Sequence, residues 1–290
     1  MKKTRSKGVL LTRTPMGGIT TCRNCIFARA MASVYTTEIT SDQLPSDNPI
    51  HQRLLMPYVW AADVVNGHLL EVGCGEGRGI GWLMPRVVSY SAIDKIERAI
   101  QQLRNKYPQG SFVSGNIPPL AAYADQSFDC VVSFQVIEHI QDDGLFLKEI
   151  NRVLKPGGKA YLTTPNRPMS LSRNPWHIRE YTATELAQLA QRFFAHVEMK
   201  GIAGNEKVMH YHERNRQSVA RLMRWDVLNL QYRLPAWMLR GPYEFMNRLN
   251  RNRLKDQADE LVMSISHTDY HVTDQAHSAL DLFLIAQRGM

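Results

Sequence analysis

The sequence of 290 residues has no apolar run that approaches the roughly eighteen residues needed to span a bilayer. An integral membrane protein is therefore not expected. Cysteine is scarce as well: the whole chain holds four, which is too few for a disulfide framework at this length. This shortage indicates a reducing compartment and predicts a cytoplasmic protein.

Acidic residues are missing before Glu38, whereas seven Lys and Arg residues precede it. That segment supplies most of the formal net charge of +8, so the remainder of the chain is nearly neutral. We predict a basic, disordered leader over residues 1–32, with an extension upstream of a start at Met31, or a transit peptide, as alternatives. Cys22 and Cys25 have metal or redox spacing, but no second Cys or His pair lies nearby.

The chain also lacks the glycine register of a dinucleotide site, although it is rich in glycine over residues 69–79. Gly73, Gly75 and Gly77 follow an apolar run, yet neither Gly73 with Gly75 nor Gly75 with Gly77 has a glycine three residues later. Asp94 ends the next apolar segment, where a Rossmann-type sheet hydrogen-bonds a ribose. The pattern predicts a nucleoside cofactor without a pyrophosphate cradle; a glycine-rich turn in an ordinary α/β domain is the alternative for the loop alone.

The spacing Glu71-x-Gly73-x-Gly75-x-Gly77, followed by Asp94, resembles the first two motifs of the class I S-adenosylmethionine-dependent methyltransferases. Two later segments, 127–140 and 154–158, resemble the fourth-strand motif and the following turn of the branch that includes quinone-biosynthesis methyltransferases. The resemblance covers about residues 69–165. It implies S-adenosylmethionine as cofactor and S-adenosylhomocysteine as product.

Strand and helix patterns alternate along the chain, which predicts an α/β fold: a Rossmann-like, mostly parallel sheet with helices on both faces. The resemblance implies seven strands, the last one antiparallel. We expect an N-terminal helical cap over 33–66, the methyltransferase domain over 67–203 and 278–290, and an α-rich insertion over 204–277. Because that insertion would leave from the carboxyl edge of the sheet, we expect it to be a lid or substrate subdomain.

The resemblance places the cofactor against particular residues of this chain. The loop Gly73, Cys74, Gly75 and Gly77 would surround its methionyl and ribose parts, and Glu71 would hold loop amides or the amino group. Asp94 would accept from the ribose hydroxyls. Asn116 stands where the family has an aspartate, and its amide oxygen can still accept from the adenine. Further contacts are expected from Lys95 and Ile117 at the adenine and from Gln135 below the sulfonium.

Methyl transfer from a sulfonium is an in-line displacement, to which a protein contributes mainly alignment. A general base is needed only when the acceptor keeps its proton at neutral pH. The candidates are His139 and His177, which follow the fourth and fifth strands. Glu138 with these histidines could in principle bind a divalent metal, but their spacing is not diagnostic, and no metal is expected. Candidate substrate-binding residues are Tyr35, His51, Arg53, Trp176, Arg179 and Tyr181.

Between Asn205 and Lys255, basic residues outnumber acidic ones by more than two to one and are interleaved with large aromatic and Met side chains. This composition fits a solvated helical cap, a surface that contacts a membrane or an anionic, lipid-like substrate, or a nucleic-acid surface. Nucleic acid is disfavoured, because the Asn-Pro-Pro-Tyr type motif of amino-methylating enzymes is missing at Ser133-Phe134-Gln135-Val136.

The sequence thus predicts an enzyme that methylates a small molecule, aromatic, quinone-like or lipid-like, on oxygen or carbon. It would be cytoplasmic, with possible peripheral membrane contact through the insertion. The alternatives are a cofactor-binding regulator that has lost catalysis and a nucleic-acid methyltransferase. No pattern names the acceptor or the oligomeric state.

Overall fold

The computed structural model describes residues 45–290, except residues 225, 227–229 and 258. The basic leader, the Cys22–Cys25 pair, residues 33–44 and the candidate substrate residue Tyr35 lie outside the described residues.

The described strands form a single sheet in the order β3-β2-β1-β4-β5-β8-β6-β7. Strands β1 to β5 pair in parallel, and β8 is antiparallel to both of its neighbours, β5 and β6. The strands are β1 (His68–Val72), β2 (Ser89–Asp94), β3 (Ser111–Ser114), β4 (Phe128–Phe134), β5 (Leu154–Pro165), β6 (His196–Gly204), β7 (Tyr270–Thr273) and β8 (Asp281–Gln287). The predicted Rossmann-like, mostly parallel sheet is confirmed.

The sheet has one strand more than the seven expected. The additional strand is β7, which pairs antiparallel with the end of β6, from Gly201↔Thr273 to Gly204↔Tyr270. Its residues belong to the segment that was expected to be insertion. A strand of four residues is too short to stand out by its sequence pattern next to a long helical segment.

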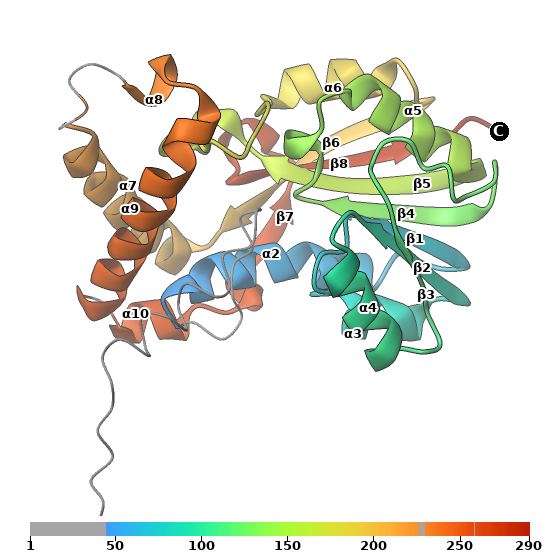
Figure 1. The fold of residues 1–290 in the computed structure, drawn as a ribbon, viewed down its shortest axis with the longest axis horizontal. Coiled ribbons are helices and arrows are strands. Elements are labelled where there is room, and N and C mark those ends of the chain that lie inside the picture. The colour runs from blue at the N-terminus through green and yellow to red at the C-terminus, as the bar shows by residue number, and fades with distance from the viewer. Residues whose placement is uncertain (1–44, 225, 227–229, 258) are drawn as a thin grey trace, which may run out of the picture. The chain divides into compact units, whose positions relative to one another are not determined.

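Helices cover both faces of the sheet (Figure 1). Side chains of α2, α3 and α4 pack with one buried cluster, and those of α5 and α6 with a second. Neighbouring strand residues alternate between the two clusters, as Leu69 and Leu70 do. These helices are α2 (Asn48–Ala61), α3 (Ile80–Leu83), α4 (Glu97–Lys106), α5 (Asp143–Val153) and α6 (Ala183–Gln191). Short 3₁₀ turns lie at Pro45–Asp47, Met84–Arg86, Ile137–His139, Arg167–Met169, His267–Asp269 and Ala276–Ser278.

Helices α7 (Glu206–Met223), α8 (Leu230–Arg233), α9 (Ala236–Gln257) and α10 (Asp259–Ser264) make up most of the segment between β6 and β8. They begin two residues after β6 ends, so they extend from the edge at which the parallel strands finish (Figure 1). The α-rich insertion is therefore present. None of the helices among the described residues combines the length and apolarity needed to cross a bilayer.

The insertion is tied to helix α2. The Asn48 side-chain amide donates to the carbonyl oxygens of Val262 and Ile265, at 2.8 Å each. Asp47 is fully buried, and its Oδ1 lies 2.9 Å from Arg248 Nη1 and 3.4 Å from Arg251 Nη1 on α9. A buried carboxylate is tolerated when it is paired in this way. Helix α2 is thus held between the insertion and the sheet.

Candidate active site

The glycine loop after β1 has open space at one residue and is tightly packed at another. Gly73 has φ +83°, and a Cβ there would stand 2.4 Å from a methyl carbon of Val136. Gly75 has φ +51°, but a Cβ at that position would have no neighbour within 4 Å among the described residues. Cys74, between them, is buried. The backbone at Gly75 is therefore accessible to a ligand.

Asp94 fixes the position of this loop. Its Oδ2 accepts from the backbone N–H of Gly75 at 2.8 Å, and its Oδ1 accepts from that of Ile96 at 2.9 Å. The next residue, Lys95, is exposed. The carbonyl of Asp94 also accepts from Gly115 at 3.0 Å, which brings the segment after β3 beside it. In that segment, Asn116 is exposed and Ile117 is half-buried. The structure therefore brings together the predicted cofactor residues of the first three strands.

Glu71 lies buried beneath the loop and is satisfied by two tyrosines. The Tyr58 hydroxyl donates to Oε1 at 2.9 Å, and the Tyr90 hydroxyl donates to Oε2. Burial raises the pKa of Glu71 to about 7, although both hydrogen bonds act to lower it. The side chain therefore anchors α2 and β2 to β1 and titrates near neutral pH.

This raised pKa predicts a pH-dependent penalty on stability. Between about pH 4.5, where the carboxyl titrates in the unfolded chain, and about pH 7, the unfolded chain releases the proton first, so ionisation favours unfolding. Relative to wild type, Glu71→Gln should gain on the order of 3 kcal/mol of unfolding free energy across that window and level off above it. Denaturant titrations at several pH values measure the difference.

Glu149→Gln is the matched control for the pH series. A hydrogen bond from Arg152 lowers the pKa of Glu149, so the stability that this carboxylate contributes is already present above pH 4.5. The difference between Glu149→Gln and wild type should therefore stay flat from pH 4.5 to 7. A flat difference for Glu71→Gln as well would contradict the assignment of the titration to Glu71.

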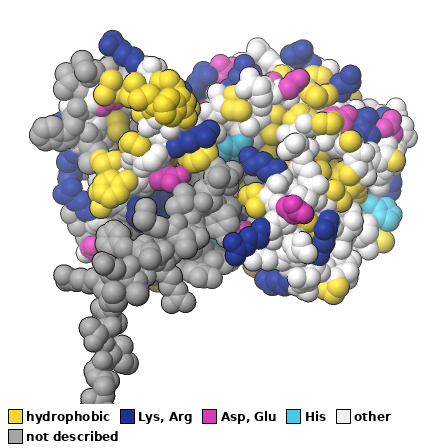
Figure 2. All heavy atoms as spheres, in the orientation of Figure 1, with side chains coloured by type: hydrophobic (Ala, Val, Ile, Leu, Met, Phe, Trp, Pro, Cys, Tyr) yellow, Lys and Arg dark blue, Asp and Glu magenta, His cyan; other side chains and the backbone are white. Residues whose placement is uncertain are grey.

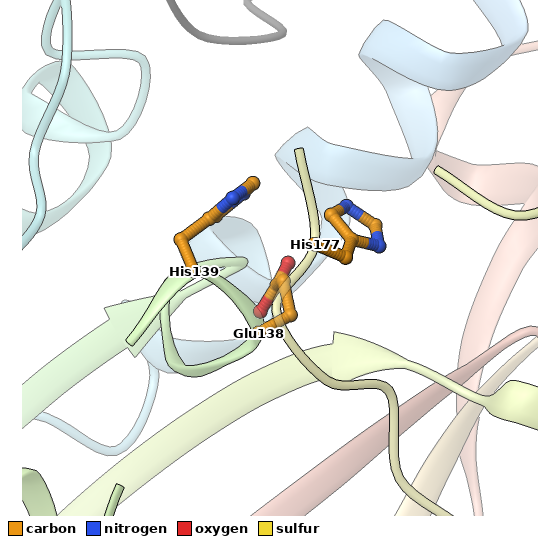
Figure 3. A group of neighbouring side chains, drawn as sticks. All are labelled: Glu138, His139 and His177. Atoms are coloured by element: carbon orange, nitrogen blue, oxygen red, sulfur yellow. The ribbon is translucent and has the colours of Figure 1, made fainter. Parts of the chain in front are cut away.

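The two candidate bases lie close together at the ends of β4 and β5 (Figure 3). The rings of His139 and His177 are edge to face, with centroids 5.0 Å apart. His139 Nδ1 is 2.9 Å from the carbonyl oxygen of Trp176, so Nδ1 carries the proton and Nε2 is the basic nitrogen of the neutral ring. Beside them, burial raises the pKa of Glu138 to about 7, and its Oε2 accepts from Thr164 at 3.0 Å.

His177 is held on both ring nitrogens. Nδ1 lies 2.6 Å from Glu180 Oε1, and Nε2 lies 2.8 Å from the Asn174 amide nitrogen. The Asn174 oxygen accepts from Trp176 N–H at 3.0 Å, which sets the amide so that its NH₂ donates to His177. Burial acts to raise the pKa of Glu180, but hydrogen bonds from His177 and Ser170 hold it below its usual range. This arrangement orients His177 and engages its basic lone pair.

Glu138, His139 and His177 have potential ligand atoms within 4.8 Å of one another. The sequence predicted no metal. To bind an ion through Nε2, His177 would have to give up its hydrogen bond from Asn174. In the observed contacts, therefore, this nitrogen of His177 is not available to an ion.

Gln135 stands between the glycine loop and this network. Its φ is +59°, its N–H donates to the Thr163 carbonyl at 2.9 Å, and its side-chain amide donates to Thr163 Oγ1 at 3.3 Å. A non-glycine residue in this conformation is uncommon and points to a functional constraint.

The remaining predicted substrate residues divide into two groups. His51 contacts Arg78 of the glycine loop, and Trp176 packs under Arg240 of α9, with the guanidinium carbon 4.0 Å from the ring centre. By contrast, Arg179 and Tyr181 both contact Asp143 Oδ2, at 2.7 and 2.8 Å. These last two side chains join their segment to α5.

Sequence reasoning missed the partner of Arg53. Arg53 Nε lies 3.2 Å from Oδ2 of Asp281, the buried first residue of β8. The available signal was an acidic residue at the head of an otherwise apolar strand, 281–286. The Tyr58 and Tyr90 contacts to Glu71 were missed as well, because no local pattern connects them.

Comparison with known proteins agrees with this geometry. Residues 70–162 match the family model of a methyltransferase domain. A probable S-adenosylmethionine-dependent methyltransferase of Mycolicibacterium smegmatis is 40% identical over 128 residues, which is 42% of this chain and 49% of that protein. The phthiotriol/phenolphthiotriol dimycocerosates methyltransferase of Mycobacterium tuberculosis is 30% identical over 168 residues, 56% of this chain and 61% of that protein.

Among solved structures, an S-adenosylmethionine-dependent methyltransferase of Thermotoga maritima, described as a possible histamine N-methyltransferase, superposes with a TM-score of 0.52. It is 14% identical, and the match covers 83% of this chain and 91% of that one. This likeness concerns the fold. The chain spans about half the length of the first two curated relatives. The segment that carries the glycine loop, residues 70–162, is therefore similar to a methyltransferase domain.

Proposed function

We propose that the protein is an S-adenosylmethionine-dependent methyltransferase that acts on a small aromatic, quinone-like or lipid-like molecule. The observation that carries the proposal is the placement of two sets of residues at one edge of the sheet. The open glycine loop held by Asp94 follows β1, and the Glu138, His139 and His177 network follows β4 and β5. A cofactor at the first set would direct its methyl group toward the second.

The residues present fit the cofactor. The open space at Gly75 would receive the ribose and methionyl parts, Asp94 has lone pairs left for ribose hydroxyls, and Asn116 and Ile117 lie where the adenine would. When bound, the cofactor supplies an activated methyl group. The chain's own task is to align the acceptor in line with it and to exclude water.

The insertion would act as the lid. It is joined to α2 by the Asp47 and Asn48 contacts, and to the segment after β5 by Arg240 over Trp176. Arg173 adds a contact to the carbonyl of Gln231 at 2.7 Å. These contacts join the insertion to α2 and to the segment after β5, and they support a role for it in substrate selection.

The experiment that tests the function has two stages. Calorimetry should detect S-adenosylmethionine binding, with a dissociation constant of roughly micromolar order. Incubation with cofactor carrying a tritiated methyl group should then label a compound in a lysate fraction. Well-folded protein that binds no cofactor would refute the proposal, and binding without any labelled product would favour the regulatory alternative.

A lipid-like acceptor and peripheral membrane contact are supported by the surface of the insertion. Large apolar side chains are exposed on α8 and α9: Tyr232, Trp237, Met238, Phe245 and Leu249. Exposed arginines lie among them, at 233, 240 and 253. Figure 2 shows hydrophobic and basic side chains together where α8 and α9 lie. The relative named for methylating phthiotriol dimycocerosates favours the same class of acceptor.

Replacing both Trp237 and Phe245 by serine should therefore reduce sedimentation with vesicles that contain anionic lipid. Because their side chains are 71% and 64% exposed, the double replacement should change the stability of the folded protein little. It would, however, remove two aromatic contacts between the protein and the membrane. Trp82→Ser, at an exposed tryptophan of α3, is the matched control and should sediment as wild type does. Equal sedimentation of all three proteins would argue against membrane contact through α8 and α9.

A further inference from the structure

Asp281 is a buried acid at the functional edge of the sheet. As the first residue of β8, it pairs with Pro165 at the end of β5 and with Ile202 near the end of β6. Its exposed fraction is 1%. Because β8 runs antiparallel, its beginning lies where the parallel strands finish, which is also where the histidine network lies.

The carboxyl group of Asp281 is incompletely satisfied by the protein. Among the described residues, neither Oδ1 nor Oδ2 accepts a hydrogen bond of good geometry, although the Gln135 side chain is near enough to lower the pKa of the group through a hydrogen bond. Arg53 Nε lies 3.2 Å from Oδ2, and that nitrogen has no aligned acceptor either. Buried polar atoms without partners are rare and costly, and each one needs an explanation. A ligand that donates a hydrogen bond to Asp281 would supply the missing partner.

The surroundings of the pair place it beside the expected methyl group. Burial raises the pKa of Asp281, whereas the charge of Arg53 on α2 and a hydrogen bond from the side chain of Gln135, which follows β4, act to lower it. Arg53 also acts on Tyr211 and His212 of α7 and on Tyr270 of β7. The pair therefore lies at the sheet edge formed by the ends of β5 and β6, near the residue expected below the sulfonium.

We propose that Arg53 and Asp281 form the site for a hydroxyl group of the acceptor, and that Asp281 is the catalytic base of an O-methylation. This inference rests on the proposed function and narrows it, because the sequence left oxygen and carbon acceptors open. The acceptor hydroxyl donates to Asp281, and the Arg53 guanidinium lies beside the oxygen that becomes negative.

The proposed O-methylation needs no reactant besides the acceptor and the cofactor. The O–H bond breaks and its proton passes to Asp281. The oxygen forms a bond to the methyl carbon, and the C–S bond breaks with its electron pair on sulfur, which leaves S-adenosylhomocysteine. Burial raises the pKa of Asp281, only partly offset by the Arg53 charge, so the group is a stronger base than an exposed aspartate. His177 is less suited, since its basic nitrogen already accepts from Asn174.

The test compares Asp281→Asn with Asp274→Asn, an exposed aspartate of the same connection whose partner is Lys200. Each protein receives tritiated-methyl cofactor and a lysate extract of lipids and phenols. Asp281→Asn should bind S-adenosylmethionine within about twofold of wild type but lose roughly 100-fold or more in turnover. Asp274→Asn should match wild type in both.

The product's chemistry gives an independent readout. Hot hydriodic acid cleaves a methyl ether and releases its label as volatile methyl iodide, whereas a methyl group on carbon is retained. Release of the label supports the inference. Retained label, or full turnover by Asp281→Asn, overturns it and leaves the methyltransferase function standing. Absence of cofactor binding or of any labelled product from wild type refutes the function itself.

Discussion

Gly79→Ala is expected to lower the free energy of unfolding by about 2 to 3 kcal/mol. A Cβ at this position would stand 1.7 Å from Cδ1 of Tyr58. The Tyr58 ring has little room to move, because it is buried, packs edge to face on Phe134 at 4.8 Å, and donates to Glu71. The backbone at Gly79 has φ −96°, which alanine adopts readily, so the cost is purely steric.

Gly81→Ala, two residues later in α3, is the matched control. A Cβ there would have no neighbour within 4 Å in the part of the chain that the structure describes, and alanine is the better helix former, so stability should stay unchanged or rise slightly. Denaturant unfolding of the two variants measures the difference. Equal stability would show that α2 does not approach the glycine loop as closely as the structure places it.

Asp94→Ala is expected to weaken S-adenosylmethionine binding by about 100-fold or more. The substitution removes the carboxylate that accepts hydrogen bonds from the Gly75 and Ile96 amides, so the glycine loop is no longer held to the end of β2. It also removes the acceptor proposed for the ribose hydroxyls. Loss of hydrogen bonds to a charged group has a magnitude of this order. Calorimetry with the purified protein measures the change.

Gly75→Arg tests the same site by obstruction. Its side chain would project into the open space at Gly75, in a backbone conformation that disfavours residues other than glycine. Combined with Asp94→Ala, it should abolish detectable binding. Glu76→Gln, at an exposed residue of the same loop, should bind as wild type does. Micromolar binding by the double variant would place the cofactor elsewhere.

The sequence was sufficient to predict the elements that depend on local patterns. The apolar strands and the glycine turn each follow from neighbouring residues, and the structure confirms them. Strand β7 could not be predicted in this way, because its pairing with β6 depends on how the insertion folds back.

The candidate site was predictable where a motif spans consecutive residues, as at Gly73–Gly77 and Glu138–His139. Contacts between distant segments were not. Arg53 and Asp281 are 228 positions apart, so neither residue's surroundings in the sequence indicate the other. The segment after β5 shows the reverse case, since Arg179 and Tyr181 are neighbours of His177 in sequence but contact Asp143. An irregular segment has no hydrophobic periodicity in its sequence that would indicate the direction of each side chain.

Helix α2 contacts both halves of the site. Arg53 meets Asp281, and Tyr58, about 7 Å further along the axis, meets Glu71 beneath the glycine loop. A short helix moves as one body, so a shift at one end is carried to the other. Two ligands that each restrain α2 are then thermodynamically linked. If the cofactor raises the affinity for the acceptor by some factor, the acceptor raises the affinity for the cofactor by the same factor.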